Sequence, residues 1–443
     1  RGFEEFKAYL DTQTMEQLSK WCGISVTDIE KLTDIFCSTA KIPLVAYTGL
    51  EYQLSAIQNN RAIFVLWAIT GKLDAPGAIY LNAKGLETPK LFEIPEDDKP
   101  IGVDEFPLFY KFSGQGQFSR FPKAVLEDEP YPVRGLMILG GSPVLSFPDS
   151  KSWREAYKKL DCLIVLDRYF TEDARYADVV FPACSLFEVP KAVPGPEGPH
   201  IVEPLIEPVG ESKNDVLIMG AIAKKLGFGD KLPQTEEELR SWLLSGTAPY
   251  AGDFGTSADQ KKEKHYKKYE TGELRADGKP GFPTPSGKLE ICSTILEENG
   301  FVPYPEYKDV RSIPELAGKE YPFTMTSGAR SNNRMGVFGA NLDKIAEIEP
   351  YPLVDINEED AKEIGIKDGD MVKVITPFAD GTFKAKIRGI ARHAIHIPHG
   401  GGSAYMAEPW KNGNVNDLCS LDYADPMTGF VLIKSVPCRV EKV

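Results

Sequence analysis

The chain has 443 residues, of which 42% are hydrophobic and 26% are charged, the proportions of a globular protein with several domains and not of a collagen, a coiled coil or a disordered chain. Acidic residues outnumber basic ones by 65 to 51, which gives a net charge of −14, so no nucleic-acid partner is expected. The longest apolar run, Ala62–Thr70, is far shorter than the ~20 residues that span a bilayer, and no transmembrane segment is predicted.

The first 134 residues combine helix signals with one strand and a long stretch of little periodicity. A capping residue before an apolar repeat of helical spacing predicts a helix start, and glycine predicts its end. The expected elements are two helices within residues 10–39 capped by Thr14 and Ser25, a short buried strand over Ile42–Tyr47 that stops at Thr48-Gly49, a largely buried helix over Gln58–Ile69, and irregular structure from Leu73 to about Arg134.

From Gly135 onward, short apolar strands alternate with helices. Strands are expected at Leu136–Leu139, Cys162–Leu166 and Val179–Phe181, and helices at Trp153–Lys159, Glu172–Tyr176 and Asp215–Leu226. This alternation predicts a parallel, helix-covered sheet. Ligands of such sheets bind beyond the carboxyl ends of the strands. The loops Gly140–Ser142 and Asp167–Thr171 are therefore expected to border a nucleotide site.

After about Lys319 the pattern changes to strands with turns between them. The predicted strands are Phe323–Thr326, Leu353–Ile356, Met371–Thr376 and Thr382–Ile387, with one short helix over Glu358–Glu363. Repeated short strands with Asp-Gly turns predict a β-barrel-like domain.

The seven cysteines are widely and unequally spaced, without any Cys-x-x-Cys pair. Neither a structural zinc site, a disulfide framework nor a local iron–sulfur motif is indicated. His393, His396 and His399 lie close in sequence, but residues three apart in a strand face opposite sides and no carboxylate or cysteine cluster accompanies them. They are interpreted as surface and turn residues, and no metal ligand is assigned.

Several short motifs follow one another in a fixed order along the chain, and each alone would be weak. They are Gly140-Gly-Ser-Pro, the run from Leu166 to Ala183, Pro208–Asp215, Thr284–Glu290, Thr326-Ser-Gly-Ala-Arg330, Pro398-His-Gly-Gly, Asn414-Val-Asn416 and Asp425–Gly429. In this order they closely resemble the molybdopterin guanine dinucleotide oxidoreductases, the dimethyl-sulfoxide-reductase family. With Tyr47–Gly49 and Ile69–Gly77, the resemblance spans nearly the whole chain.

The resemblance implies an α/β fold with parallel, helix-covered nucleotide-binding sheets and a C-terminal double-psi-like β-barrel. Residues 1–80 would be the end of an α/β cofactor-binding domain, residues 81–318 a second, Rossmann-like domain with irregular insertions, and residues 319–443 the dinucleotide-binding barrel. It also implies the later portion of a catalytic subunit: the family's iron–sulfur and metal-ligand segments would precede Arg1, and the chain is expected to be inactive by itself.

The implied activity is transfer of an oxygen atom or a hydride at molybdenum or tungsten. Two molybdopterin guanine dinucleotides (bis-MGD) would hold the metal, and an iron–sulfur cluster is expected only in the preceding part. The expected partners are a small-molecule substrate and an electron-transfer iron–sulfur subunit. Formate dehydrogenases of this family place an arginine near the metal, shortly after the segment that here reads Leu73–Asn82. No arginine occurs between Arg61 and Arg120, so the resemblance disfavours formate as the substrate. A tungsten-dependent hydratase-type relative and a non-catalytic cofactor-binding module are the alternatives.

The chemistry of the motif residues suits the parts of such a cofactor. Carboxylates accept hydrogen bonds from the N–H groups of guanine, glycine loops offer backbone N–H groups to pyrophosphate, and amides and a guanidinium suit the polar edge of a pterin. No catalytic residue is assigned. The expected cofactor-binding residues are Thr48, Gly49, Gly140, Gly141, Ser142, Asp167, Thr171, Asp215, Ser327, Gly328, Arg330, His399, Asn414, Asn416 and Lys434.

Overall fold

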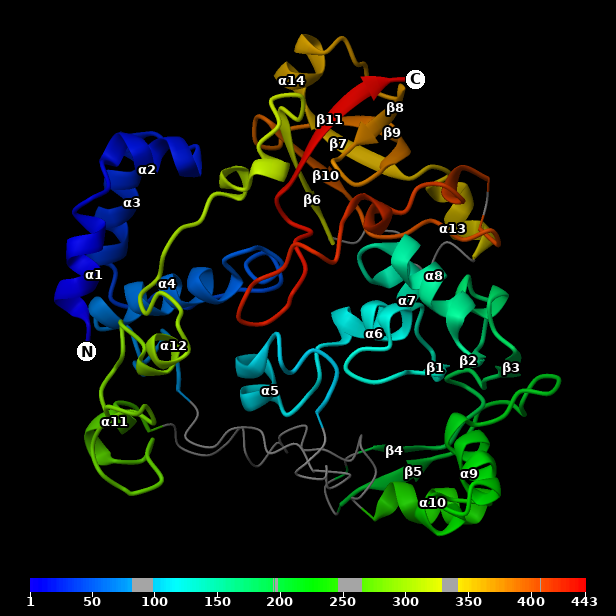
Figure 1. Ribbon diagram of the computed structural model, residues 1–443. Coiled ribbons are helices and arrows are strands. Elements are labelled where there is room, and N and C mark those ends of the chain that lie inside the picture. Colours follow the sequence, from blue (N-terminus) through cyan, green and yellow to red (C-terminus); the bar gives the residue numbers. More distant parts are fainter. Residues whose placement is uncertain (82–98, 194, 196–197, 246–264, 329–341, 407) are drawn as a thin grey trace. The chain divides into compact units, whose positions relative to one another are not determined.

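The computed structural model describes residues 1–81, 99–193, 195, 198–245, 265–328, 342–406 and 408–443. The chain divides into two compact units (Figure 1). The first consists of Arg1–Thr88 and Lys261–Asp309, and the second of Pro89–Gln260 and Val310–Val443. Residues 265–309 therefore fold with the N-terminal segment, although the sequence of the second unit from Pro89 to Gln260 lies between them.

The first unit is mainly helical. Thr14 and Ser25 cap two of its helices as predicted, accepting hydrogen bonds from the N–H groups of Gln17 and Asp28, and a first helix that the sequence analysis missed precedes them. Its helices are α1 (Phe3–Leu10), α2 (Met15–Cys22), α3 (Val26–Ser38), α4 (Ala56–Ile69), α11 (Lys268–Thr271) and α12 (Thr294–Glu298).

The strand predicted over Ile42–Tyr47 is wrong, because no strand forms there. Pro43 lacks the N–H group that a strand ladder needs, and the side chains of Val45 and Tyr47 are exposed to solvent. The carbonyl oxygen of Ile42 instead accepts a hydrogen bond from the indole of Trp67 at 2.8 Å. Apolar residues in a row were thus not sufficient evidence of a buried strand.

A buried ion pair joins the two sequence segments of the first unit. The ammonium of Lys268 lies 2.6 Å from Asp74 Oδ1, and both side chains are nearly inaccessible to solvent. Asp74 also accepts the backbone N–H of Lys268 at 2.7 Å. The Lys268 ammonium lies 3.8 Å from the ring centre of Tyr80, which adds a cation–π contact.

The second unit contains the predicted parallel sheet. Its strands β1 (Gly135–Leu139), β2 (Cys162–Asp167) and β3 (Val179–Pro182) lie in that order and are all parallel. Figure 1 shows the helices α7 and α8 beside this sheet. The neighbouring helices are α6 (Phe121–Glu127), α7 (Pro143–Ser146) and α8 (Ser150–Lys159), and α5 (Pro107–Ser113), β4 (Lys191–Val193), β5 (His200–Val202), α9 (Asp215–Lys225) and α10 (Glu236–Leu244) complete this part.

Two predictions in this region need correction. The stretch expected to be irregular up to Arg134 contains α5 and α6, both of which begin with a proline in their first turn, a position where proline favours a helix. The helix expected over Glu172–Tyr176 is only a 3₁₀ turn, η2 (Asp173–Arg175). Buried contacts of Glu172 and Asp173 hold this turn, as described below.

The remainder of the second unit is a closed six-stranded barrel with the strand order β10-β6-β11-β8-β9-β7. β6 pairs with β10 in parallel and with β11 in antiparallel orientation, and β7 and β9 are also parallel. Met325, Ile356, Val374 and Phe383 fill its interior without exposure to solvent. The strands are β6 (Phe323–Ser327), β7 (Leu353–Asn357), β8 (Met371–Ile375), β9 (Asp380–Arg388), β10 (Ala394–Ile397) and β11 (Val436–Lys442), with helices α13 (Asp343–Ile348) and α14 (Glu358–Glu363).

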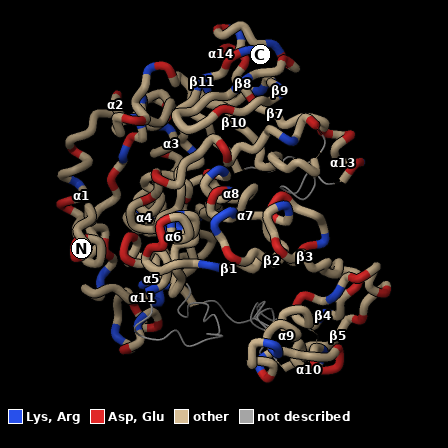
Figure 2. Tube along the Cα trace, turned by 45° about the vertical axis from the view of Figure 1, so that its right-hand side comes forward, with Lys and Arg blue, Asp and Glu red and all other residues tan. Residues whose placement is uncertain are grey.

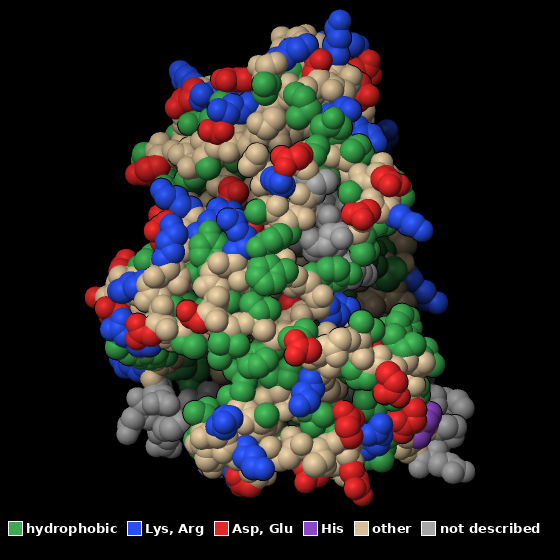
Figure 3. Space-filling model, turned by 90° about the vertical axis from the view of Figure 1, so that its right-hand side faces the viewer, with side chains coloured by type: hydrophobic (Ala, Val, Ile, Leu, Met, Phe, Trp, Pro, Cys, Tyr) green, Lys and Arg blue, Asp and Glu red, His purple; other side chains and the backbone are tan. Residues whose placement is uncertain are grey.

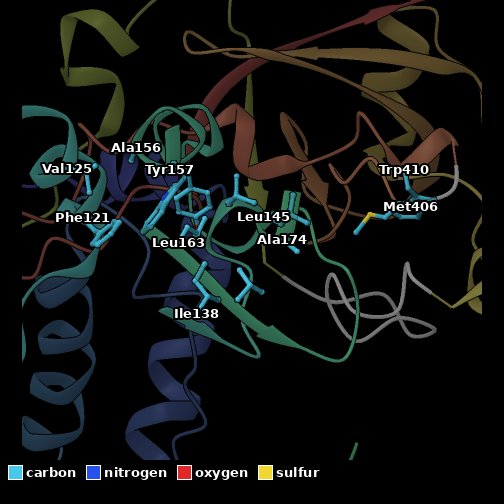
Figure 4. Close-up of a cluster of buried hydrophobic side chains, with 13 residues drawn as sticks. Phe121, Val125, Ile138, Leu145, Ala156, Tyr157, Leu163, Ala174, Met406 and Trp410 are labelled. Atoms are coloured by element: carbon cyan, nitrogen blue, oxygen red, sulfur yellow. The ribbon is translucent and has the colours of Figure 1, made fainter. Parts of the chain in front are cut away.

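The sheet and the barrel share one hydrophobic core. Met406 and Trp410, from the long connection that follows β10, belong to the same buried cluster as Leu145 and Ala174 of the sheet domain. Figure 4 shows these two side chains projecting from the barrel connection, with Leu145 and Ala174 on the sheet side. The loops at the carboxyl end of the sheet are therefore held against loops of the barrel.

The surface carries charges of both signs. Figure 2 shows Lys and Arg interspersed with Asp and Glu along the trace, and the face in Figure 3 mixes them with exposed apolar side chains. The net negative charge is thus distributed over the surface. Among the described helices, none is both long enough and apolar enough to cross a membrane.

Candidate functional site

The loop that follows β1 presents unpaired backbone donors at the carboxyl edge of the sheet. Gly140 adopts a left-handed conformation with φ of 60°, and its N–H donates to the carbonyl of Leu166 at 2.9 Å. Within the part of the chain that the structure describes, the next two N–H groups, of Gly141 and Ser142, have no acceptor. Two adjacent unpaired donors beside a glycine are suited to an anionic ligand.

The side chain of Ser142 is directed into the protein. Its hydroxyl donates a hydrogen bond to the carboxylate of Asp173. Asp173 also accepts hydrogen bonds from the N–H of Val144 at 3.1 Å and from the hydroxyl of Tyr157 at 2.8 Å. The Asp173 side chain is completely buried, and this burial raises the pKa of its carboxyl group.

Two carboxylates lie near the end of β2. Asp167 is the last residue of β2, and its carboxylate accepts the N–H of Tyr169 at 3.0 Å. Asp215 is the first residue of α9, which Asn214 caps. Burial raises the pKa of Asp215, the negative charge of Asp167 raises it further, and the nearby Arg168 opposes this. The structure thus brings together the two residues that the sequence analysis selected as guanine acceptors.

The loop after β2 also reaches the barrel. Thr171 accepts the N–H of Ala174 at 3.3 Å and so begins the turn η2. The next residue, Glu172, is buried, forms an ion pair with Arg175 at 2.7 Å, and accepts the N–H of Ala404 at 3.0 Å. Ala404 lies in the connection that follows β10.

On the barrel, Lys434 lies against the end of β6. Its ammonium donates to the carbonyl oxygen of Ser327, and burial lowers the pKa of Lys434. None of the described residues forms an ion pair with it. Gly328 has a φ of +97°, and a Cβ at this position would lie 2.7 Å from the Lys434 ammonium. A desolvated cation without a carboxylate partner is suited to bind an anion.

The amides of Asn414 and Asn416 are buried and bonded within the protein. Asn414 donates to the hydroxyl of Ser150 at 3.0 Å, and Asn416 donates to the carbonyl of Leu145 at 2.7 Å. Asn416 also lies 3.4 Å from Nδ1 of His399. In the structure these amides fasten the barrel to α7 and α8, and their contact with a pterin stays a prediction.

Three of the expected residues are not part of the described second unit. Thr48 and Gly49 belong to the first unit, where their carbonyl groups accept hydrogen bonds from the N–H of Glu51 and the side chain of Gln53. Arg330 lies outside the described residues. The described residues contain no group of three or more His, Cys, Asp or Glu side chains that could hold a metal ion.

Two buried contributors, Glu172 and Asp173, escaped the sequence analysis. The predicted helix over Glu172–Tyr176 contains both residues, and no role was assigned to either. Acidic residues in a helix are usually solvated. The only signal in the sequence was their place directly after a strand end in a parallel sheet. Their partners, Ser142 and Ala404, lie in other segments that the local pattern does not connect to them.

Comparison with protein families gives two matches. Residues 50–225 match the family described as "Molybdopterin oxidoreductase", and residues 324–437 match the "Molydopterin dinucleotide binding domain". These ranges contain the sheet loops and most of the barrel, respectively.

Among curated proteins, the chain is 27% identical to the probable oxidoreductase YoaE of Bacillus subtilis over 84% of this chain and 53% of that protein. It is 26% identical to the F420-dependent formate dehydrogenase subunit alpha of Methanocaldococcus jannaschii, and 24% identical to the acetylene hydratase of Syntrophotalea acetylenica, in both cases over 90% of this chain and 59% of the relative. The chain thus spans little more than half the length of these relatives.

A solved structure has the same fold. The acetylene hydratase from Pelobacter acetylenicus superposes with a TM-score of 0.80 at 21% sequence identity, covering 100% of this chain and 66% of the hydratase. This similarity and the closed barrel confirm the predicted fold class of a parallel α/β sheet followed by a barrel.

Proposed function

Because the chain is a homologue of the dimethyl-sulfoxide-reductase family and carries its molybdopterin oxidoreductase and dinucleotide-binding domains, we propose that it binds molybdopterin guanine dinucleotide in a molybdenum or tungsten oxidoreductase. The metal would be held by two such dinucleotides. When bound, the metal and its pterins supply two-electron redox chemistry, with transfer of an oxygen atom or a hydride to or from a small-molecule substrate.

The observation that carries this proposal is that backbone N–H donors and carboxylate acceptors lie at the same edge of the sheet. The unpaired N–H groups of Gly141 and Ser142 follow β1, and the carboxylates of Asp167 and Asp215 lie at the end of the adjacent β2. A guanine nucleotide needs donors for its phosphates and acceptors for the N–H groups of its base. These residues offer both.

The barrel supplies a second group that suits a nucleotide. The half-buried ammonium of Lys434 lacks an ion-pair partner among the described residues, and a phosphate oxygen would compensate its charge. In this proposal Lys434, Ser327 and Gly328 contact a phosphate, Thr171 assists at the loop after β2, and His399, Asn414 and Asn416 line the pterin side. Arg330, Thr48 and Gly49 complete the proposed cofactor-binding set.

The proposal extends to a larger assembly. The Methanocaldococcus jannaschii relative is named as a subunit alpha, and we propose an electron-transfer iron–sulfur subunit as the partner of this protein. In this proposal, an iron–sulfur cluster and the protein ligand of the metal would not be supplied by the residues described here.

Metal and nucleotide analysis of the protein purified anaerobically from its own cells tests the proposal. We expect molybdenum or tungsten together with about two GMP released per metal by acid hydrolysis, and reduction or oxidation of a viologen dye with substrate. Metal with hydration activity but no dye reaction would favour the hydratase alternative. Pterin nucleotide that is transferred to another protein without turnover would favour the cofactor-binding module, and absence of pterin would contradict the proposal.

A further inference from the structure

We infer that the adjacent residues Glu172 and Asp173 are positioning residues that hold two loops of the nucleotide site, one from the sheet and one from the barrel. Asp173 fixes the loop after β1 and Glu172 fixes the loop after β10. Only the expected effect on nucleotide binding rests on the proposed function. The bracing of the two loops stands on contacts in the structure itself.

Asp173 fixes the loop after β1 through three donors. Ser142, Val144 and Tyr157 all donate hydrogen bonds to its carboxylate. Tyr157 belongs to α8 and is itself buried in the hydrophobic core. Asp173 therefore ties Ser142, at the end of the glycine loop, to the buried helix α8.

This contact assigns a role to Ser142 that its sequence motif does not suggest. A serine hydroxyl has one proton, and here that proton is directed to Asp173. The hydroxyl can therefore offer only lone pairs to a ligand, which would not attract phosphate. In the loop Gly140–Ser142, the backbone N–H groups of Gly141 and Ser142 are the groups left to bind an anion.

Glu172 fixes the loop after β10 through one donor. Its Oε2 accepts the N–H of Ala404, and its Oε1 is paired with Arg175. The residues before Ala404 include Gly401 and Gly402, whose φ values of 92° and 93° lie in the left-handed region. Because glycine-rich backbone is readily rearranged, an external anchor at Ala404 restricts the conformations of this loop.

The local geometry explains how neighbouring residues can serve different loops. Glu172 precedes and Asp173 begins the 3₁₀ turn η2, in which successive side chains point about 120° apart. The carboxylate of Glu172 can thus face the barrel loop while that of Asp173 faces the sheet loop. A ring contact between Phe170 and Tyr405, with centroids 5.2 Å apart, supports the barrel side.

Hydrogen exchange of the ligand-free chain tests the bracing without any assumption about function. We expect Asp173→Asn to accelerate exchange of the Val144 N–H, and Glu172→Gln to accelerate exchange of the Ala404 N–H, each by about five- to tenfold, because an amide replaces the carboxyl acceptor. Each variant should leave the other loop unchanged. Glu172→Ala and Asp173→Ala should accelerate exchange of the same N–H groups more strongly than Glu172→Gln and Asp173→Asn, because alanine offers no acceptor. Glu155→Gln, on the exposed face of α8, is the matched control.

Binding of GDP then measures the consequence for the site. Glu172→Gln and Asp173→Asn should each weaken GDP binding by about tenfold, whereas Glu155→Gln should not. Equal acceleration throughout the protein, or no acceleration at either amide, would overturn the inference. Local acceleration with unchanged GDP affinity would reduce both residues to a structural role and also overturn it. A wild-type chain that does not bind GDP would contradict the proposed function instead, and the exchange pattern would still decide the bracing.

Discussion

The side-chain amide of Asn416 donates a 2.7 Å hydrogen bond to the carbonyl oxygen of Leu145, which is 271 positions away in the sequence. In return, the carbonyl of Asn416 accepts the N–H of Asp149 at 2.9 Å. Both Asn416 and Leu145 are buried. A barrel loop and the helix that follows the glycine loop of the sheet are therefore fastened at this point by paired polar groups.

Asn416→Ala should destabilise the second unit. The substitution removes the amide donor and leaves the buried carbonyl of Leu145 without its partner, which costs about 1–3 kcal/mol. Urea denaturation followed by tryptophan fluorescence measures the effect. Asn299→Ala, in which the lost amide lies at an exposed helix end, is the control and should change stability by less than about 0.5 kcal/mol. Equal stability of Asn416→Ala and wild type would contradict this interpretation.

Asp167→Asn should weaken guanine nucleotide binding while making the free protein more stable at neutral pH. The amide retains an oxygen for the N–H of Tyr169, but one of the two proposed acceptors for guanine loses its charge, at an expected cost in affinity of about 1–3 kcal/mol. Calorimetric titration with GDP measures this loss, and the exposed Asp161, one position before β2, provides the control variant Asp161→Asn.

The stability change follows from the raised pKa of Asp215. A carboxyl group whose pKa is higher in the folded state contributes stability at low pH that is lost as the pH rises through that folded pKa. Removing the charge of Asp167 lowers the pKa of Asp215 and reduces the loss. The variant should therefore melt above wild type at pH 7, and the difference should vanish below about pH 4. A variant that melts below wild type at pH 7 would contradict the proximity of the two carboxylates.

Lys434→Met should bind GDP at least about tenfold more weakly, because a charge-assisted bond to phosphate is lost. The pKa of Lys434 is lowered by burial, so its stability contribution is present above its ordinary pKa and is lost as the pH falls through the folded pKa. The variant should thus be as stable as wild type or more so at pH 7. Lys362→Met, at an exposed ion pair on α14, is the control, and unaltered GDP affinity of Lys434→Met would remove Lys434 from the site.

Lys268→Met should destabilise the first unit more than any exposed ion-pair variant. It leaves the fully buried Asp74 carboxylate without its cation, which costs about 3–5 kcal/mol. The double variant Asp74→Asn with Lys268→Met should recover part of this loss, because no unpaired charge remains. Lys7→Met, from an exposed pair with Asp11, should cost no more than about 1 kcal/mol. Thermal melting of wild type, Lys268→Met, the double variant and Lys7→Met measures these differences in stability.

The sequence was informative where a pattern is local. The strands β1, β2 and β3 could be predicted because short apolar runs alternate with helical segments, and Asp167 could be selected because it ends one of them. The predicted barrel strands and the helix over Glu358–Glu363 agree with the structure for the same reason. Parallel topology then determines which strand ends share an edge.

Contacts between distant segments could not be predicted in this way. Nothing near Asp173 in the sequence indicates that Ser142 and Tyr157 will donate to it. The amides of Asn414 and Asn416 appeared available for a ligand because composition does not reveal their partners in α7 and α8. At Ile42–Tyr47 the apolar residues predicted a buried strand, whereas this described segment pairs with none of the described strands.

The strand order of the barrel has a consequence for biosynthesis. β6 is the first barrel strand to leave the ribosome, yet its two neighbours are β10 and β11, the last two barrel strands of the chain. One edge of β6 stays unpaired until Ala394–Ile397 has been made, and the other until Val436–Lys442 has been made. Lys434 reaches the carbonyl of Ser327 only at the same stage. A nascent chain therefore lacks part of the proposed phosphate site, and insertion of the proposed cofactor would have to follow translation of the barrel.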